Sequence, residues 1–144
     1  MLERKGRATW EGTLTEGKGT VALGSGLWEG AYSYRSRFVD EKPQATNPEE
    51  LVGTALAACF SQAFSLELEQ AGFPPKRIQT EASVRLEKKG DGFAITSIAL
   101  STEAVVADIS EEKFQSIAEA AKDGCPVSQA LAGPKKTITA RLVR

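Results

Sequence analysis

The chain of 144 residues contains two cysteines and no histidine. Cys59 lies in the alanine-rich stretch "GTALAACFSQ", and Cys125 lies in "DGCPVSQA". The lack of histidine excludes Ser-His and Cys-His catalysis and most zinc sites, and two lone cysteines make a poor metal site. A thiolate in this protein must therefore be stabilised by lysine, arginine or backbone dipoles, and protons must be handled by carboxylates.

The two cysteines allow three interpretations from the residues alone. Free cysteine is among the most buried residue types, so both can be ordinary core residues. They can instead form a structural disulfide, or a reactive pair that is oxidised and reduced in turn. The N-terminus has no apolar signal-peptide region and indicates a cytoplasmic protein, and a reducing cytoplasm favours a transient disulfide over a permanent one.

Cys125 is expected at the junction of two helices. Gly124 suits the end of one helix, and Pro126 suits the first position of the next, so Cys125 falls at or near an N-cap. Unpaired backbone N–H groups at such a position stabilise a thiolate. The sequence therefore predicts a lowered pKa for Cys125.

Cys59 needs a cation to be reactive, because burial alone raises the pKa of a thiol. Arg35 and Arg37 are the best candidates, since the alternating stretch 31–38 is expected to be a strand with both arginines on one face. Glu49 precedes Cys59 by ~15 Å along the same helix axis, so it acts there only through an arginine or from a second subunit. The alternatives are a solvated strand face for the arginines and helix-dipole stabilisation for Glu49.

The elements that position these residues begin with strands. A hairpin is expected in "RATWEGTLTEGKGTVAL" around the turn "EGKG", followed by the strand 31–38. A helix is predicted from Asn47 to about Gln70, capped by Thr46 or Asn47 and stopped at Gly72. Consecutive apolar residues from 55 to 60 cover every face of it, so burial all round is expected. No apolar run approaches the ~20 residues that a membrane span needs.

The second half of the chain alternates hairpin, helices and strand. A β-hairpin is expected over 78–106 with the turn "KKGDG", then a helix from Ser110 to Gly124 with an apolar stripe, a short helix "CPVSQALA" and a closing strand "KKTITARLVR". This order predicts an α+β fold in one domain spanning 1–144. A helix without a polar face needs cover on every side, so we expect a homodimer. The net charge of -1 gives no reason to expect nucleic acid or an anionic membrane as partner.

Four stretches of the sequence resemble the OsmC/Ohr family of osmotically inducible and organic hydroperoxide resistance proteins. They are "KGRATWEGTLTEGKGTV", "TNPEELVGTALAACFS", "GFAITSIAL" and "GCPVSQAL", in the order found in that family. The N-terminal match points to the osmotically inducible branch. The resemblance implies an OsmC/Ohr-like fold, with antiparallel strands around a long buried central helix, and an intertwined homodimer with two active sites at the subunit interface.

The resemblance also implies a cysteine-based peroxidase that reduces organic hydroperoxides in oxidative and osmotic stress defence. Cys59 matches the peroxidatic cysteine, Cys125 the resolving cysteine and Glu49 the glutamate of the family motif, while Arg37 matches the family arginine with Arg35 as the second choice. Glu49 is expected to orient Arg37 across the dimer. Oxidation ends in a Cys59–Cys125 disulfide that an external dithiol reduces, of lipoyl type in relatives, with no bound cofactor and no metal.

Two other classes of function compete with this prediction. A thiol redox sensor needs one oxidation event and a partner, and a small-molecule-binding stress protein needs no thiol chemistry at all. Multiple turnovers with peroxide and dithiol distinguish the enzyme from both.

Overall fold

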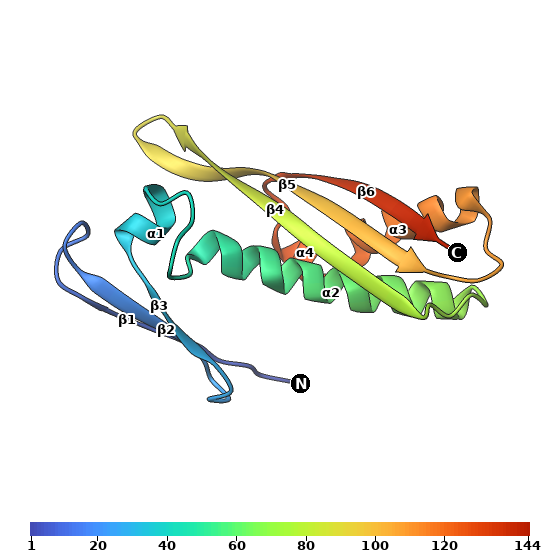
Figure 1. The fold of residues 1–144 in the computed structure, drawn as a ribbon, viewed down its shortest axis with the longest axis horizontal. Helices are drawn as coiled ribbons and strands as arrows, with labels where there is room; N and C mark the ends of the chain where they lie inside the picture. The colour runs from blue at the N-terminus through green and yellow to red at the C-terminus, as the bar shows by residue number, and fades with distance from the viewer. The chain divides into compact units, whose positions relative to one another are not determined.

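The structure, a computed structural model, describes residues 1–144 in the element order β-β-β-α-α-β-β-α-α-β (Figure 1). The chain divides into two compact units, Met1–Leu51 and Val52–Arg144, which are described separately. Two three-stranded sheets and one long helix confirm the α+β class. A single domain over 1–144 stays a prediction.

The first unit contains an antiparallel sheet of β1 (Gly6–Glu11), β2 (Lys18–Leu23) and β3 (Glu29–Tyr32) in the order β1-β2-β3. The expected hairpin is confirmed, but its turn is not "EGKG". Glu11 pairs with Lys18, so the connecting loop is 12–17 and the last two residues of "EGKG" already belong to β2. The charged and glycine-rich composition of that segment marked the right region but not the right register.

The strand expected over 31–38 is wrong beyond Tyr32, because residues Tyr34–Phe38 form the short helix α1. Ser33 and Ser36 form a complete capping box at its start. The side chain of Ser33 accepts from the N–H of Ser36 at 3.1 Å, and the N–H of Ser33 donates to the Ser36 hydroxyl at 3.0 Å. These two local bonds satisfy orphan donors of the first turn and favour the helix over the alternating strand pattern.

The long helix α2 spans Pro48–Gln70 and confirms the predicted element. Asn47 caps it, because its side-chain oxygen accepts from the N–H of Glu50 at 2.8 Å. The helix stops before Gly72, whose φ of 90° suits glycine and is unfavourable for other residues. The boundary between the two units falls within the first turns of this helix.

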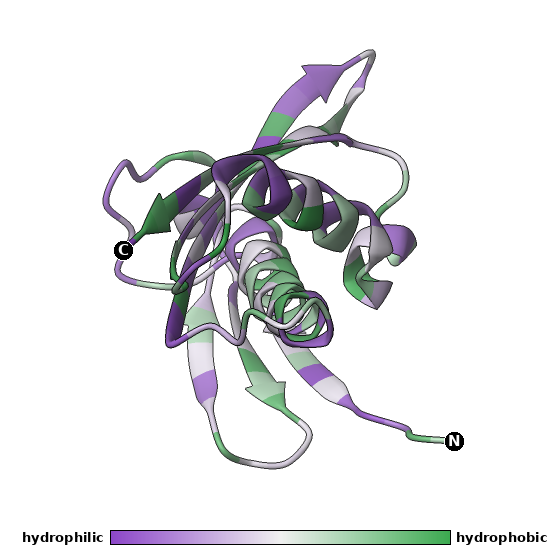
Figure 2. Ribbon diagram, turned by 90° about the vertical axis from the view of Figure 1, so that its right-hand side faces the viewer, coloured by the Kyte–Doolittle hydropathy of each residue, from purple (hydrophilic) through white to green (hydrophobic).

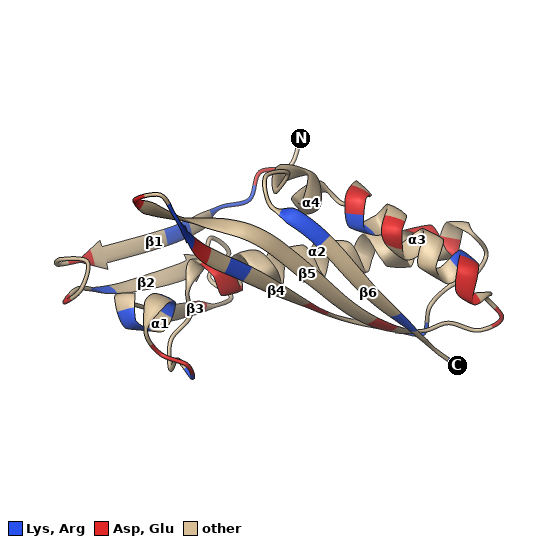
Figure 3. Cartoon of the chain, turned by 90° about the horizontal axis from the view of Figure 1, so that it is seen from above, with Lys and Arg blue, Asp and Glu red and all other residues tan.

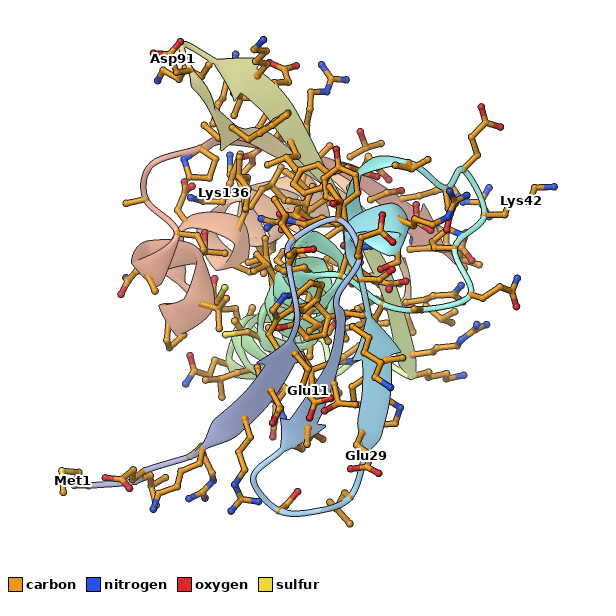
Figure 4. The ribbon with its side chains drawn as sticks, turned by 90° about the vertical axis from the view of Figure 1, so that its left-hand side faces the viewer. Met1, Glu11, Glu29, Lys42, Asp91 and Lys136 are labelled. Carbon is orange, nitrogen blue, oxygen red and sulfur yellow. The ribbon has the colours of Figure 1, made fainter.

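The second unit contains the sheet β4-β5-β6. Strands β4 (Arg77–Lys89) and β5 (Gly92–Val105) form the predicted hairpin, with a tight turn that carries Asp91 at its tip (Figure 4). Strand β6 (Lys135–Val143) is parallel to β5. Helices α3 (Glu111–Gly124) and α4 (Pro126–Ala130) lie between β5 and β6 in the chain.

In the second unit, α2 and α3 pack on one face of the β4-β5-β6 sheet (Figures 1 and 2). The Phe64 ring of α2 lies 5.4 Å from the Phe114 ring of α3. Gly53 lets α2 approach β4, since a Cβ there would lie 3.1 Å from the carbonyl oxygen of Ala82. Charged residues occur along the whole length of α3 (Figure 3). The predicted apolar stripe of this helix packs against the core, so the helix is amphipathic.

Helix α2 is not buried on every face within one chain, and its burial all round stays a prediction for the homodimer. Leu56, Phe60, Phe64 and Leu68 are fully buried, whereas Ala58 is exposed. The helix is also long and apolar enough to span a membrane, which the sequence reading missed, and 28% of its most apolar window is buried. The fully buried side chains at four-residue spacing identify a core helix with one uncovered apolar face.

Candidate functional site

Cys125 joins two helices in the second unit. Its N–H donates to the carbonyl oxygen of Ala121 at 3.2 Å and closes α3, and its sulfur accepts from the N–H of Ser128 at 3.4 Å and caps α4. The predicted N-cap is therefore confirmed. The helix α3 ends at Gly124, as expected, and its C-cap is Cys125 itself.

The expected lowering of the Cys125 pKa is wrong in its net direction. Burial raises the pKa of this thiol above its ordinary value, the Ser128 N–H lowers it, and the neighbouring Cys59 raises it further. Cys125 is 1% exposed, so loss of water around the anion outweighs the backbone donors. The buried Cys125 is thus favoured in its protonated form.

Cys59 lies on α2 beside this buried thiol. It is half-buried, it packs against the core cluster that includes Cys125, and both cysteines are free. The neighbouring Cys59 side chain raises the pKa of Cys125. The structure therefore brings together the two predicted cysteines, which lie 66 positions apart in the sequence.

Arg37 and Glu49 form an ion pair within the first unit. The Nη2 of Arg37 donates to Oε1 of Glu49 at 2.7 Å, and its Nε lies 3.1 Å from both carboxylate oxygens. The Glu49 residue is 9% exposed, whereas the Arg37 side chain is 36% exposed. Two-point binding fixes the plane of the guanidinium and leaves part of it available to another group.

The structure forms the Arg37–Glu49 ion pair within one chain, so a second subunit is not needed to supply Glu49. The sequence reading placed Arg37 on a strand, from which its distance to Glu49 could not be judged. In the structure, α1 turns the chain so that Arg37 faces the first turn of α2. The pair is thus a local product of one chain.

Hydrogen bonds between α1 and the start of α2 hold this ion pair. The Ser36 hydroxyl donates to the Thr46 carbonyl oxygen at 2.7 Å, and the Asn47 side chain donates to the Ser36 carbonyl oxygen at 3.3 Å. Ser36 is 4% exposed. Because the bonds are directional and partly shielded from water, they restrain the helix that carries Arg37.

Arg35 is engaged elsewhere. Its Nη2 lies 2.8 Å from Oδ1 of Asp40, and its side chain is 69% exposed. A surface pair of this kind contributes little to stability. Of the two arginines weighed from the sequence, Arg37 is the one that pairs with Glu49.

An aromatic cavity of about 210 Å³ adjoins Arg37 within the first unit. The rings of Trp10 and Tyr32 lie 5.3 Å apart, and those of Tyr34 and Phe38 lie 5.2 Å apart. The Arg37 guanidinium lies 5.0 Å from the centre of the Phe38 ring. The lining combines apolar surface with one cation, which suits a ligand that has an apolar body and a polar end.

Sequence reasoning missed three features of these sites. The serine pair around α1 is readable as a capping spacing, Ser33-x-x-Ser36, but the alternating pattern concealed it. Ser128 stands at the same spacing after Cys125, in "CPVS". The aromatic cavity had no sequence signal beyond alternating aromatic residues, because the turn into α1 creates it.

Comparison with known proteins places this geometry in a family. The family model described as OsmC-like protein matches residues 40–140. The chain is 52% identical over 131 residues to the Escherichia coli protein named peroxiredoxin OsmC, covering 90% of each chain. The chain belongs to the OsmC-like family. The resemblance carried by the cysteine motifs is thereby confirmed.

Other relatives of this OsmC-like protein agree. An organic hydroperoxide resistance protein-like sequence of Staphylococcus aureus is 33% identical over 91 residues, 62% of this chain and 64% of the relative. The crystal structure of an organic hydroperoxide resistance protein from Elizabethkingia anophelis has a TM-score of 0.75 at 23% identity and covers 99% of both chains. The structural match confirms the OsmC/Ohr-like fold.

Proposed function

We propose that this OsmC-like protein is a thiol-dependent peroxidase that reduces organic hydroperoxides to alcohols in stress defence. The observation that carries the proposal is the neighbouring pair of a half-buried Cys59 and a buried Cys125, in a chain 52% identical to a protein named peroxiredoxin. The relatives named for organic hydroperoxide resistance support the substrate class. The cytoplasm, where thiols are kept reduced, is the proposed place of action.

Oxidation begins at Cys59. Its thiolate attacks the distal oxygen of ROOH, the O–O bond breaks, and the departing alkoxide takes a proton and leaves as ROH, so that Cys59 becomes a sulfenic acid. Arg37, held by Glu49 at 2.7 Å, is proposed to supply the positive charge that stabilises the thiolate and the developing alkoxide.

Cys125 then resolves the sulfenic acid. Its sulfur attacks the Cys59 sulfur, water leaves, and the Cys59–Cys125 disulfide forms. An external dithiol reduces that disulfide and is itself oxidised to a cyclic disulfide, which returns both protein thiols. The raised pKa of Cys125 fits this order, since a protonated thiol does not compete with Cys59 for peroxide.

A homodimer is part of the proposal. The uncovered apolar face of α2, of whose most apolar window only 28% is buried within one chain, needs a cover that a second copy supplies. We infer that the dimer is intertwined, with two active sites at its interface. Sedimentation equilibrium at micromolar concentration tests this part separately: a monomer there contradicts the dimer and leaves the chemistry untouched.

A thiol titration tests the peroxidase. Reduced protein is mixed with cumene hydroperoxide, free thiols are counted, and dihydrolipoamide is then added to follow repeated peroxide consumption. Both thiols should disappear and turnover should follow. Cys59→Ser should lose all peroxide reaction, and Cys125→Ser should react once and stop at a sulfenic acid.

The same titration distinguishes the competing functions. Loss of both thiols without repeated turnover with any dithiol supports a redox sensor. No loss of thiols in the wild-type protein supports a small-molecule-binding protein. Turnover in Cys59→Ser contradicts the assignment of the peroxidatic residue.

A further inference from the structure

We propose that the reducing dithiol attacks the Cys59 sulfur of the disulfide, and that the hydroxyl of Ser128 stabilises the Cys125 sulfur as it leaves. The inference rests on the proposed function and specifies which sulfur of the disulfide the reductant attacks. It also gives Ser128 a role that sequence reasoning did not assign.

The two sulfurs differ in access. Cys125 is 1% exposed, whereas Cys59 is half-buried at the edge of the core cluster. A thiolate attacks a disulfide sulfur that it can reach, and the other sulfur departs. An incoming dithiol therefore meets Cys59 first, and Cys125 becomes the leaving group.

The hydroxyl of Ser128 is a hydrogen-bond donor without a partner, and it lies beside the leaving group, Cys125. In α1 the capping box is complete, because Ser33 and Ser36 each bond the other's backbone N–H. At α4 the Ser128 N–H donates to the Cys125 sulfur at 3.4 Å, but the reciprocal bond is absent, since the Cys125 N–H already donates to Ala121 at 3.2 Å. The Ser128 hydroxyl is consequently without a partner, although the residue is 1% exposed.

A buried hydroxyl without a partner destabilises a fold, so its presence asks for an explanation. The third residue of a helix can turn its side chain back toward the N-cap. A rotation about the Cα–Cβ bond of Ser128 thus directs its O–H to the Cys125 sulfur when that sulfur becomes negative. Burial raises the pKa of Cys125, so its departure as an anion needs such donors.

The step balances in atoms and electrons. The thiolate of the dithiol forms a bond to the Cys59 sulfur, the Cys59–Cys125 bond breaks, and its electron pair stays on Cys125. The Cys125 thiolate, held by the N–H and O–H of Ser128, then takes a proton. The second thiol of the reductant then attacks the reductant's sulfur that is bonded to Cys59 and releases the Cys59 thiolate. The dithiol thereby loses two electrons and the protein gains them.

Mapping the mixed disulfide tests the direction of attack. The wild-type disulfide is formed with diamide, which makes the result independent of peroxide chemistry, and is mixed briefly with excess monothiol. After acid quench and alkylation, mass spectrometry of tryptic peptides locates the added thiol. We expect it on Cys59, with Cys125 alkylated. The added thiol on Cys125 would overturn the proposal, whatever the outcome with peroxide.

The role of Ser128 is tested by its removal. Ser128→Ala should slow reduction of the diamide-formed disulfide by about tenfold, because a hydrogen bond to a charged group is lost. Its melting temperature should stay equal or rise, since an unpartnered buried hydroxyl is removed. Oxidation of Cys59 by peroxide should be unchanged, which separates this test from failure of the proposed function.

Thr96→Val is the matched control. Thr96 is the other residue with a buried hydroxyl that lacks a partner, and it belongs to β5 rather than to the cap of α4. The control should raise stability in the same way and leave the reduction rate unchanged, and Ser128→Thr, which retains a hydroxyl, should restore most of that rate. Wild-type reduction rates in Ser128→Ala, or equal slowing in Thr96→Val, would contradict the assignment.

Discussion

The two units of the chain hold their reactive groups by different forces. In the first unit, Arg37 is fixed by directional bonds to Glu49 and by the hydrogen bonds that clamp α1. In the second unit, Cys125 is fixed by apolar packing among phenylalanine, leucine and alanine side chains, and its sulfur has only weak backbone donors such as the Ser128 N–H at 3.4 Å. The first arrangement presents a charge, and the second removes a sulfur from water.

This difference predicts different responses to substitution. A polar clamp depends on individual atoms, so isosteric changes should alter reactivity with little loss of global stability. An apolar core depends on filled volume, so truncation should cost stability first. Four substitutions or conditions break or sharpen this contrast.

Truncation of the second unit's core should give the largest effect. Phe64→Ala removes a fully buried ring that contacts Phe60 and Phe114, and should lower the free energy of unfolding by about 3–5 kcal/mol. Urea unfolding followed by circular dichroism measures it. Ser116→Ala on the exposed face of α3 is the control, with a change within about 0.5 kcal/mol. A loss below 1 kcal/mol in Phe64→Ala would show that the packing of this core is not the main source of the unit's stability.

Removing the charge of Glu49, which fixes Arg37 in the first unit, should act mainly on the rate of the peroxide reaction. Glu49→Gln keeps the side-chain shape but removes the charge that orients Arg37, and should slow the reaction with cumene hydroperoxide by about a hundredfold. Stability should change by less than about 2 kcal/mol, because Arg37 keeps access to water. Stopped-flow thiol oxidation and urea unfolding measure the two quantities.

Asp40→Asn is the matched control for that variant. It releases Arg35 from the surface pair with Asp40 at 2.8 Å. Its peroxide reaction should keep the wild-type rate. If Asp40→Asn were the slow variant and Glu49→Gln the fast one, the role would move from Arg37 to Arg35.

Loss of the α1 cap should give a smaller and local effect. Ser33→Ala removes one half of the capping box and should destabilise the helix by about 1 kcal/mol. Hydrogen exchange should accelerate at the amides of α1 and stay unchanged in the β4-β5-β6 sheet. Equal acceleration in both places would mean that the two units unfold together.

The pH dependence of stability should give the smallest effect. Because the pKa of Cys125 is raised in the folded protein, its contribution to stability is fully present below the unfolded-state pKa of about 8.5 and is lost as pH rises through the folded-state pKa. Reduced wild-type protein should therefore lose about 1 kcal/mol or less relative to Cys125→Ser between pH 7 and pH 10. A wild-type protein that gains stability over this range would mean a lowered pKa.

Structural features that depend on short-range sequence patterns were predicted well. The capped helix α2, the β4–β5 hairpin, the α3 stripe and the N-cap position of Cys125 each follow from short-range patterns. The helix α1 was not predicted, because the alternating residues 33–38 fit the pattern of a strand as well as that of a helix capped by Ser33.

Features that depend on burial were predicted poorly. The Cys125 pKa moves opposite to the prediction, since the packing around the sulfur is a tertiary property that the cap motif does not encode. The Arg37–Glu49 pair was named residue by residue, but its formation within one chain depends on the turn at Ser33. Types of residue were therefore easier to assign than their surroundings.

A single-turnover mass measurement tests most directly whether the two sulfurs act as one oxidisable pair. Reduced protein receives one equivalent of cumene hydroperoxide, is alkylated and is analysed by mass spectrometry before and after trypsin. The chemistry proposed here predicts a loss of two hydrogens, no alkylation, and one cross-linked species that joins the Cys59 and Cys125 peptides. Added oxygen on Cys59 with Cys125 still alkylated, or both thiols unchanged, would contradict it.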